Sequence, residues 1–82
     1  MKPALRSAEA AALIDRFVEG KLRYPQEWND FIEAGTVEPR VEPFRRRCYE
    51  LDPLVNVPGN PNRQALAELR SISKQLADLP TR

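Results

Sequence analysis

The hydrophobic residues of this chain recur at the spacing of one helix face in four separate segments. In residues 7–19 they fall at Leu13, Ile14, Phe17 and Val18, and in residues 25–34 at Trp28, Phe31 and Ile32. Residues 40–51 carry Val41, Phe44, Cys48 and Leu51, and residues 61–78 carry Leu66, Leu69, Ile72 and Leu76. Spacings of three and four residues place side chains on one side of an α-helix. The pattern therefore predicts four amphipathic helices and shows no strand periodicity.

Prolines, glycines and small polar residues mark where these helices are expected to begin and end. Ser7 is the predicted N-cap of the first helix, and Gly20 follows its last turn. Pro25 suits the first position of the second helix, because an N–H at that position would have no partner within the helix. Asn60 is the predicted cap of the last helix, with Pro61 at its first position.

The third helix is the least regular, because proline occurs near both of its ends. Pro43 either begins this helix or distorts its first turn, and the pattern leaves both interpretations open. Asp52 and Pro53 are expected to end it. Residues 53–59 mix apolar residues with prolines, which predicts an extended segment lying along the surface of the bundle.

Short links between the helices predict an all-α bundle of about four helices. The helices at 7–19 and 25–34 are joined by about five residues, so they are expected to form an antiparallel hairpin. A chain of 82 residues makes one domain, near the small end of domains that fold alone. Its hydrophobic fraction of 41% argues against intrinsic disorder.

The composition excludes most catalytic designs. The chain has no histidine and one cysteine, so the Ser-His-Asp and Cys-His nucleophile systems lack their imidazole. A structural zinc site needs about four cysteine or histidine ligands, which this chain cannot supply. We therefore expect no catalytic residue, no metal and no cofactor, and a protein that acts by binding rather than as an enzyme.

Charge and hydropathy bear on location. The formal net charge is +1 although 30% of the residues are charged, so the whole chain has no electrostatic attraction to nucleic acid or to a membrane surface. No apolar run reaches the length of about 20 residues that spans a bilayer. The N-terminus lacks the apolar stretch of a signal peptide, and a single cysteine suits a reducing compartment. These features predict a cytoplasmic protein without a membrane partner.

An acidic face is predicted on the second helix. Glu27, Asp30 and Glu33 lie within about a third of its circumference and point away from Trp28. A solvated acidic face is the ordinary interpretation, and a docking surface for a basic partner protein is the functional one. Tyr49 lies off the hydrophobic seam of the third helix, so it is expected to be half exposed and to contact the partner.

Trp28 and Cys48 are both predicted to be buried. Trp28 is the only tryptophan, and it is interpreted as a core anchor, with an interface contact as the alternative. Cys48 lies on the hydrophobic seam of the third helix. It is expected to be an inert thiol, because the chain has no histidine to activate it.

Basic side chains of the third and fourth predicted helices form a second candidate face: Arg45, Arg46, Arg47, Arg70 and Lys74. Successive helical residues point about 100° apart, so the arginine run fans out rather than forming one stripe. Glu42 and Glu50 lie four residues either side of Arg46, where they can pair with it. A solvated, salt-bridged face is the ordinary interpretation, and nucleic-acid binding is the functional alternative.

Residues 12–34 resemble the opening helix pair of small helical bacterial immunity proteins of the colicin type. The resemblance rests on residues 13–21, an apolar helix that ends in a Gly-Lys turn, and on the following segment Trp28-Asn29-Asp30-Phe31. It implies a cytoplasmic protein that binds a toxin domain and blocks it. A nuclease toxin is basic, so the face formed by Glu27, Asp30 and Glu33 would suit such a partner.

These observations give one leading hypothesis and two alternatives. The leading hypothesis is a non-enzymatic protein-interaction domain, in the manner of an immunity protein or an antitoxin-like inhibitor. The first alternative is a small helical nucleic-acid-binding regulator. The second is a structural module that forms homo-oligomers through the 66–79 seam of the last helix, whose spacing is that of a coiled coil.

Overall fold

Helices account for the regular structure of this protein. The computed structural model describes residues 5–34, 37–57, 59 and 61–79. These residues contain no strand and four α-helices, which are Ser7–Val18 (α1), Gln26–Ala34 (α2), Glu42–Val55 (α3) and Arg63–Ala77 (α4). An isolated parallel bridge joins Leu5 to Val37. The predicted all-α class is therefore confirmed.

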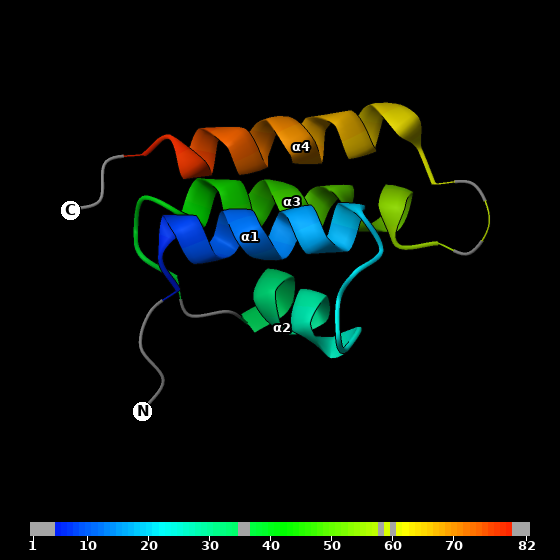
Figure 1. The fold of residues 1–82 in the computed structure, drawn as a ribbon, viewed down its shortest axis with the longest axis horizontal. Coiled ribbons are helices and arrows are strands. Elements are labelled where there is room, and N and C mark those ends of the chain that lie inside the picture. The colour runs from blue at the N-terminus through cyan, green and yellow to red at the C-terminus, as the bar shows by residue number, and fades with distance from the viewer. Residues whose placement is uncertain (1–4, 35–36, 58, 60, 80–82) are drawn as a thin grey trace.

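The helices form a small bundle in which each helix packs on two others. α1, α3 and α4 lie along the long axis of the molecule, and the shorter α2 lies on the side opposite α4 (Figure 1). α2 packs on α1 and α3, and α4 packs on the same two helices. The chain reverses direction between α1 and α2, as the short connection predicts, and α1 and α4 also run in opposite directions.

The most extensive helix contact is between α1 and α4. Small residues line the α1 side, where Ser7, Ala10 and Ala11 are buried. The helices therefore approach closely enough for the Ser73 hydroxyl of α4 to lie 3.2 Å from the carbonyl oxygen of Ala11. The same hydroxyl lies 2.6 Å from a carboxylate oxygen of Asp15. Ser73 is itself buried, and these acceptors satisfy its hydroxyl group.

The hydrophobic seam of α4 forms part of the core of the monomer. Leu69, Ile72 and Leu76 are buried, and Leu66 and Leu79 pack against the core from its edge. A coiled-coil contact between two copies would need these side chains to be exposed. Because these side chains are in the core, they do not form the exposed seam that the sequence pattern suggested for self-association.

Trp28 joins three helices at the centre of the core. It is 1% exposed. Its indole stacks on Phe17 of α1, with ring centroids 3.9 Å apart and 7° between the ring planes. The indole Nε1–H donates a 2.8 Å hydrogen bond to a carboxylate oxygen of Asp52 on α3. The interpretation of Trp28 as a core anchor is confirmed.

The first turns of α1 and α3 differ in detail from the prediction. Arg6, not Ser7, is the N-cap of α1, and its backbone N–H donates a 3.0 Å hydrogen bond to the Glu9 carboxylate. The shift of one residue puts Glu9 at the third helical position, where an acidic side chain can satisfy the cap. α3 begins at Glu42, so Pro43 lies in the first turn, where its missing N–H costs the helix no hydrogen bond.

The predicted end of α3 at Asp52 and Pro53 is wrong. The helix continues through Pro53 to Val55, so the first part of the predicted extended segment is helical. Pro53 lies in the last turn, where it removes only the hydrogen bond to the carbonyl of Tyr49. Burial of Val55 and the 2.8 Å hydrogen bond from the Asn56 N–H to the Asp52 carbonyl hold this turn in place.

The predicted start of α4 is also two residues too early. The helix begins at Arg63, and the side chain of Asn62 caps it by accepting the N–H of Ala65 at 3.0 Å. The backbone N–H of Asn62 donates to the carbonyl of Leu54 at 2.9 Å, which ties the cap to the end of α3. Asn60, the predicted cap, lies outside the described residues.

No helix in the part of the chain that the structure describes is both long enough and apolar enough to cross a lipid bilayer. The longest of these helices, α4, has 15 residues. A membrane-spanning helix needs about 20 residues.

We expect replacement of Leu69 by alanine to destabilise the protein by about 2–5 kcal/mol, because the side chain is fully buried between α4 and α1. Leu54→Ala is the matched control, since Leu54 is 47% exposed and should change stability by less than about 1 kcal/mol. Urea denaturation followed by helical circular dichroism measures both. Equal losses would contradict this assignment of the core.

Candidate protein-interaction surface

Most acidic side chains in the described part of the chain have an ion-pair or hydrogen-bond partner. Of the twelve acidic residues, nine have one: Glu9, Asp15, Glu19, Glu27, Glu38, Glu42, Glu50, Asp52 and Glu68. The other three, Asp30, Glu33 and Asp78, have none among the described residues. Asp30 and Glu33 are both exposed and lie three residues apart on α2. This helix therefore carries two neighbouring carboxylates whose charge the fold leaves uncompensated.

Asp30 and Glu33, which we call the acid pair, occupy the outward face of α2. The buried side chains of this helix point to the opposite side. Glu27 points toward α1 instead, where its carboxylate lies 3.5 Å from the guanidinium of Arg16. Of the three predicted acidic residues, Asp30 and Glu33 thus have no ion-pair partner within the described ranges, and Glu27 forms an ion pair between α1 and α2.

Tyr49 belongs to α3 and lies on the side of this helix from which Arg45 and Asp52 contact α2. α2 and α3 are held in antiparallel register at one end by the hydrogen bond from Trp28 to Asp52. At the other end, the Arg45 guanidinium donates to the carbonyl of Ile32. Tyr49 falls between Arg45 and Asp52, hence level with the middle of α2. It is 54% exposed, which confirms the predicted half-exposure.

Tyr24 adds a second exposed aromatic ring next to α2. It is 59% exposed, and its backbone carbonyl accepts the N–H of Glu27 at 3.0 Å at the start of the helix. We call the surface formed by Tyr24, Asp30, Glu33 and Tyr49 the α2–α3 surface. Tyrosine rings combine a large apolar body with a polar tip, and exposed carboxylates attract basic groups, so this set of side chains suits contact with a basic protein.

A shallow cleft of about 280 Å³ adjoins the α2–α3 surface, where α1 ends and α2 begins. Phe17, Leu22, Pro25 and Trp28 supply its apolar lining, and Asn29 and Asn56 supply polar groups. Gly20 also lines it and has φ 72°, a left-handed conformation that glycine adopts without strain. The turn after α1 therefore brings Leu22 back beside α2 and the end of α3.

Arg45 makes contacts within the fold and does not contribute to an exposed basic surface. Its side chain is 17% exposed, and its guanidinium makes two 2.7 Å hydrogen bonds to the carboxylate of Glu42. It also donates to the Ile32 carbonyl in the last turn of α2, where the helix dipole favours a positive charge. The hydrogen bonds between the two side chains lower the pKa of Glu42 and raise the pKa of Arg45.

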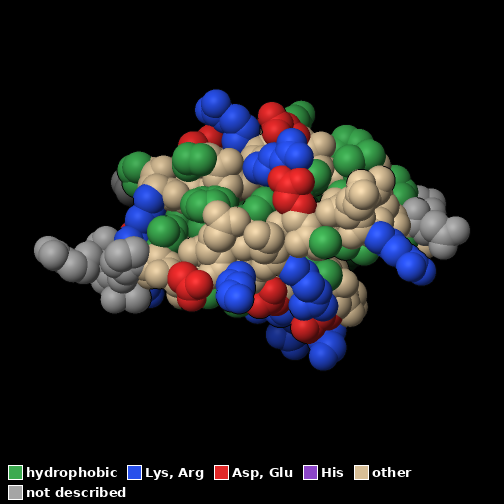
Figure 2. Space-filling model, turned by 90° about the horizontal axis from the view of Figure 1, so that it is seen from above, with side chains coloured by type: hydrophobic (Ala, Val, Ile, Leu, Met, Phe, Trp, Pro, Cys, Tyr) green, Lys and Arg blue, Asp and Glu red, His purple; other side chains and the backbone are tan. Residues whose placement is uncertain are grey.

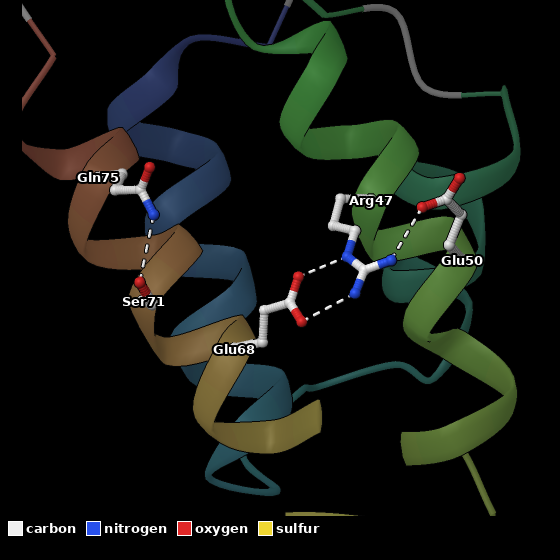
Figure 3. Close-up of polar contacts among 5 residues, drawn as sticks. All are labelled: Arg47, Glu50, Glu68, Ser71 and Gln75. Atoms are coloured by element: carbon white, nitrogen blue, oxygen red, sulfur yellow. Dashed lines mark hydrogen bonds and ion pairs between the residues drawn. The ribbon is translucent and has the colours of Figure 1, made fainter. Parts of the chain in front are cut away.

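Arg47 ties α3 to α4 (Figure 3). Its guanidinium donates to both carboxylate oxygens of Glu68 on α4, one bond measuring 2.9 Å, and to Glu50 at 3.1 Å. Hydrogen bonding to Arg47 lowers the pKa of Glu68. Arg46 points to solvent, with its guanidinium 3.8 Å from Glu42. The arginine run therefore fans out into three directions as a salt-bridged face, which confirms the ordinary interpretation of its spacing.

Arg70 and Lys74 lie on a different side of the molecule from the arginine run. Glu68 faces α3, and Arg70 and Lys74 point about 160° and about 120° away from it around α4. Both are exposed and share one stripe with Arg63, and none of the three has an ion-pair partner within the described ranges. Figure 2, which looks down on α4, shows basic and acidic side chains interspersed on this side. The structure does not bring the five predicted basic residues to one face.

Cys48 is buried in the core, as predicted. Removal from water raises the pKa of its thiol to about 12, although the nearby Arg45 charge acts in the opposite direction. The described residues contain no group of three or more histidine, cysteine, aspartate and glutamate side chains that could hold a metal ion.

Comparison of the chain with protein-family models, curated proteins and solved structures gives no significant match. The chemistry of the α2–α3 surface and its cleft is therefore the evidence that bears on function.

The cleft and the hydrogen bond from Trp28 to Asp52 were not predicted from the sequence. The turn 20–25 did carry a signal, since Leu22 stands between a glycine and a proline. Whether such a leucine fills the core or lines an open cleft depends on where α3 ends. The sequence predicted that end at Asp52 and Pro53, and the helix continues to Val55.

We expect Cys48 to resist alkylation in the folded protein. A thiol with a pKa of about 12 is almost wholly protonated at pH 8, and the thiolate is the reactive form. Iodoacetamide labelling followed by mass spectrometry should therefore be much slower in the native protein than in the urea-unfolded protein. Equal rates in the two states would show that the thiol is open to solvent in the native ensemble.

Proposed function

We propose that this chain is a non-enzymatic protein-interaction domain that binds a basic partner protein through the α2–α3 surface. The observation that carries the proposal is that the acid pair has no ion-pair partner among the described residues, within which nine of the twelve acidic side chains have partners. Tyr24, which precedes α2, and Tyr49, on the side of α3 that contacts α2, are more than half exposed.

The two kinds of side chain would contribute differently to binding. Exposed ion pairs are worth only about 0–1 kcal/mol each, so Asp30 and Glu33 would chiefly speed association and select a partner of opposite charge. Buried tyrosine rings are among the side chains that contribute most to interface affinity. Tyr24 and Tyr49 would therefore provide most of the contact energy once the charges have oriented the partner.

An immunity-like or antitoxin-like inhibitor is the specific form of this proposal. A basic toxin domain, such as a nuclease, has the charge that the acid pair would attract, and its partner would work in the same cytoplasmic compartment. The resemblance of residues 12–34 to the opening helix pair of colicin-type immunity proteins supports this form.

A nucleic-acid-binding role is the second candidate. The observation that favours it is the stripe of Arg63, Arg70 and Lys74 on α4, whose side chains are exposed and lack ion-pair partners among the described residues. Arg45 and Arg47 would contribute little to nucleic-acid binding, because their guanidinium groups pair with Glu42 and Glu68.

We expect a basic partner to lose affinity for Asp30→Lys and for Glu33→Lys by about tenfold or more, because each change replaces attraction by repulsion. The partner is first recovered by pull-down from nuclease-treated lysate of the source organism, and affinities are then measured with the purified partner by calorimetry.

The matched control for this experiment is Asp78→Lys, which makes the same charge change at an exposed acidic residue at the end of α4. Its affinity should remain close to that of the original protein. Equal losses for all three variants would mean that net charge, rather than the α2–α3 surface, governs binding.

If the α4 stripe binds nucleic acid, log affinity should fall against log salt concentration with a slope of about −3, one unit for each phosphate contact. Fluorescence anisotropy with labelled duplex DNA and single-stranded RNA measures this slope, and Arg70→Glu should reduce the binding. Absent binding, or binding insensitive to salt, would remove the second candidate.

A further inference from the structure

Two exposed hydrophobic residues are direct sequence neighbours of residues that line the cleft. Four large hydrophobic residues are at least 41% exposed in the described part of the chain: Tyr24, Tyr49, Leu54 and Val57. Tyr24 precedes Pro25 and Val57 follows Asn56, and both of these neighbours line the cleft. Apolar side chains that remain exposed together beside a concave site mark a surface suited to a partner.

The size of the cleft bears on what could occupy it. Its volume of about 280 Å³ lies just below the range of about 300–1,000 Å³ that is usual for small-molecule sites, and it is open to solvent. A free ligand would therefore stay largely exposed. A single bulky side chain anchored to a partner protein is a better fit, because the rest of the partner would cover the opening.

Negative charge adjoins the cleft on the side of α2. Asn29 on its rim directly precedes Asp30 and lies one helical turn, about 6 Å along the axis, from Glu33. α1 and α3 also end here, just before the cleft residues Gly20 and Asn56, and helix C-termini favour positive charge. An apolar pocket and uncompensated acidic groups thus lie within reach of one short peptide segment.

We propose that the cleft and the acid pair together recognise a segment of a partner protein in which a bulky apolar residue is followed, within four residues, by lysine or arginine. The inference deepens the proposed function and rests on it. The apolar side chain packs against Phe17 and Leu22, and the basic side chain reaches Asp30 or Glu33. Four residues of a helix or two of an extended chain both cover about 6 Å, so either conformation spans the distance.

A random peptide-display library panned on the immobilised full chain tests this recognition. Enriched sequences should pair a large aliphatic or aromatic residue with lysine or arginine at a spacing of four or fewer. The most enriched peptide, made synthetically, should shift the nuclear magnetic resonance signals of the Trp28 indole N–H and of Asn29 and Asn56. These groups line the cleft.

Two cleft variants and one control separate the cleft from the acid pair. Asn56→Tyr fills the cleft from an exposed position, and Leu22→Ala removes part of its lining. Each variant should lower the affinity for the peptide by about tenfold, which is the effect of losing the burial of one large apolar side chain. Gln64→Tyr makes a matched change at an exposed position of α4 and should leave the affinity unchanged. Helical circular dichroism verifies that each variant is folded.

Two outcomes would overturn the inference. Basic peptides that lose affinity for Asp30→Lys but bind both folded cleft variants normally would remove the cleft from the interface and leave the proposed function standing. Enrichment of purely apolar peptides, or no enrichment at all, would remove the combined recognition and would also count against a basic partner.

Discussion

The contact of Trp28 with Phe17 and Asp52 is the constraint on which the rest of the structure depends. A buried indole needs an acceptor for its N–H, and Asp52 provides one from α3 while Phe17 stacks on the ring from α1. α2 is too short to bury much surface alone, so this contact fixes its position between two longer helices. The same contact helps to set the register of α3 against α2, and Trp28 supplies part of the lining of the cleft.

Ion pairs within the fold determine which charges remain available to a partner. Arg45 and Arg47 belong to an arginine run of the kind that binds nucleic acid, but both are engaged in ion pairs. Arg45 pairs with Glu42 and also contacts α2, and Arg47 pairs with Glu68 on α4. An arginine held in two hydrogen bonds by a carboxylate has little residual attraction for phosphate. The net charge is only +1, but charges that form no ion pair in the described part of the chain are separated: carboxylates lie on α2 and basic side chains lie on α4.

The domain is so small that its candidate functional groups lie on its surface and not in an enclosed interior site. A bundle of this length buries one core and has little interior space, and the cleft beside α2 is shallow. Its exposed tyrosines, its acid pair and its apolar cleft all lie on or beside α2 and α3, which the hydrogen bond from Trp28 to Asp52 ties together. Side chains carried by packed helices lose less conformational entropy on binding than side chains of an unstructured segment, which would help the proposed recognition of a partner.

The sequence by itself determined the four helices, the side of each that is buried and the exposed acidic positions of α2, because these follow from a period of 3.6 residues. The fan of the arginine run followed from the same period. Only the tertiary structure decided that α3 continues past Pro53, since burial of Val55 outweighs one lost hydrogen bond in the last turn. It alone paired Glu27 with Arg16 and formed the cleft, because both depend on distances between helices that no periodicity within one helix can specify.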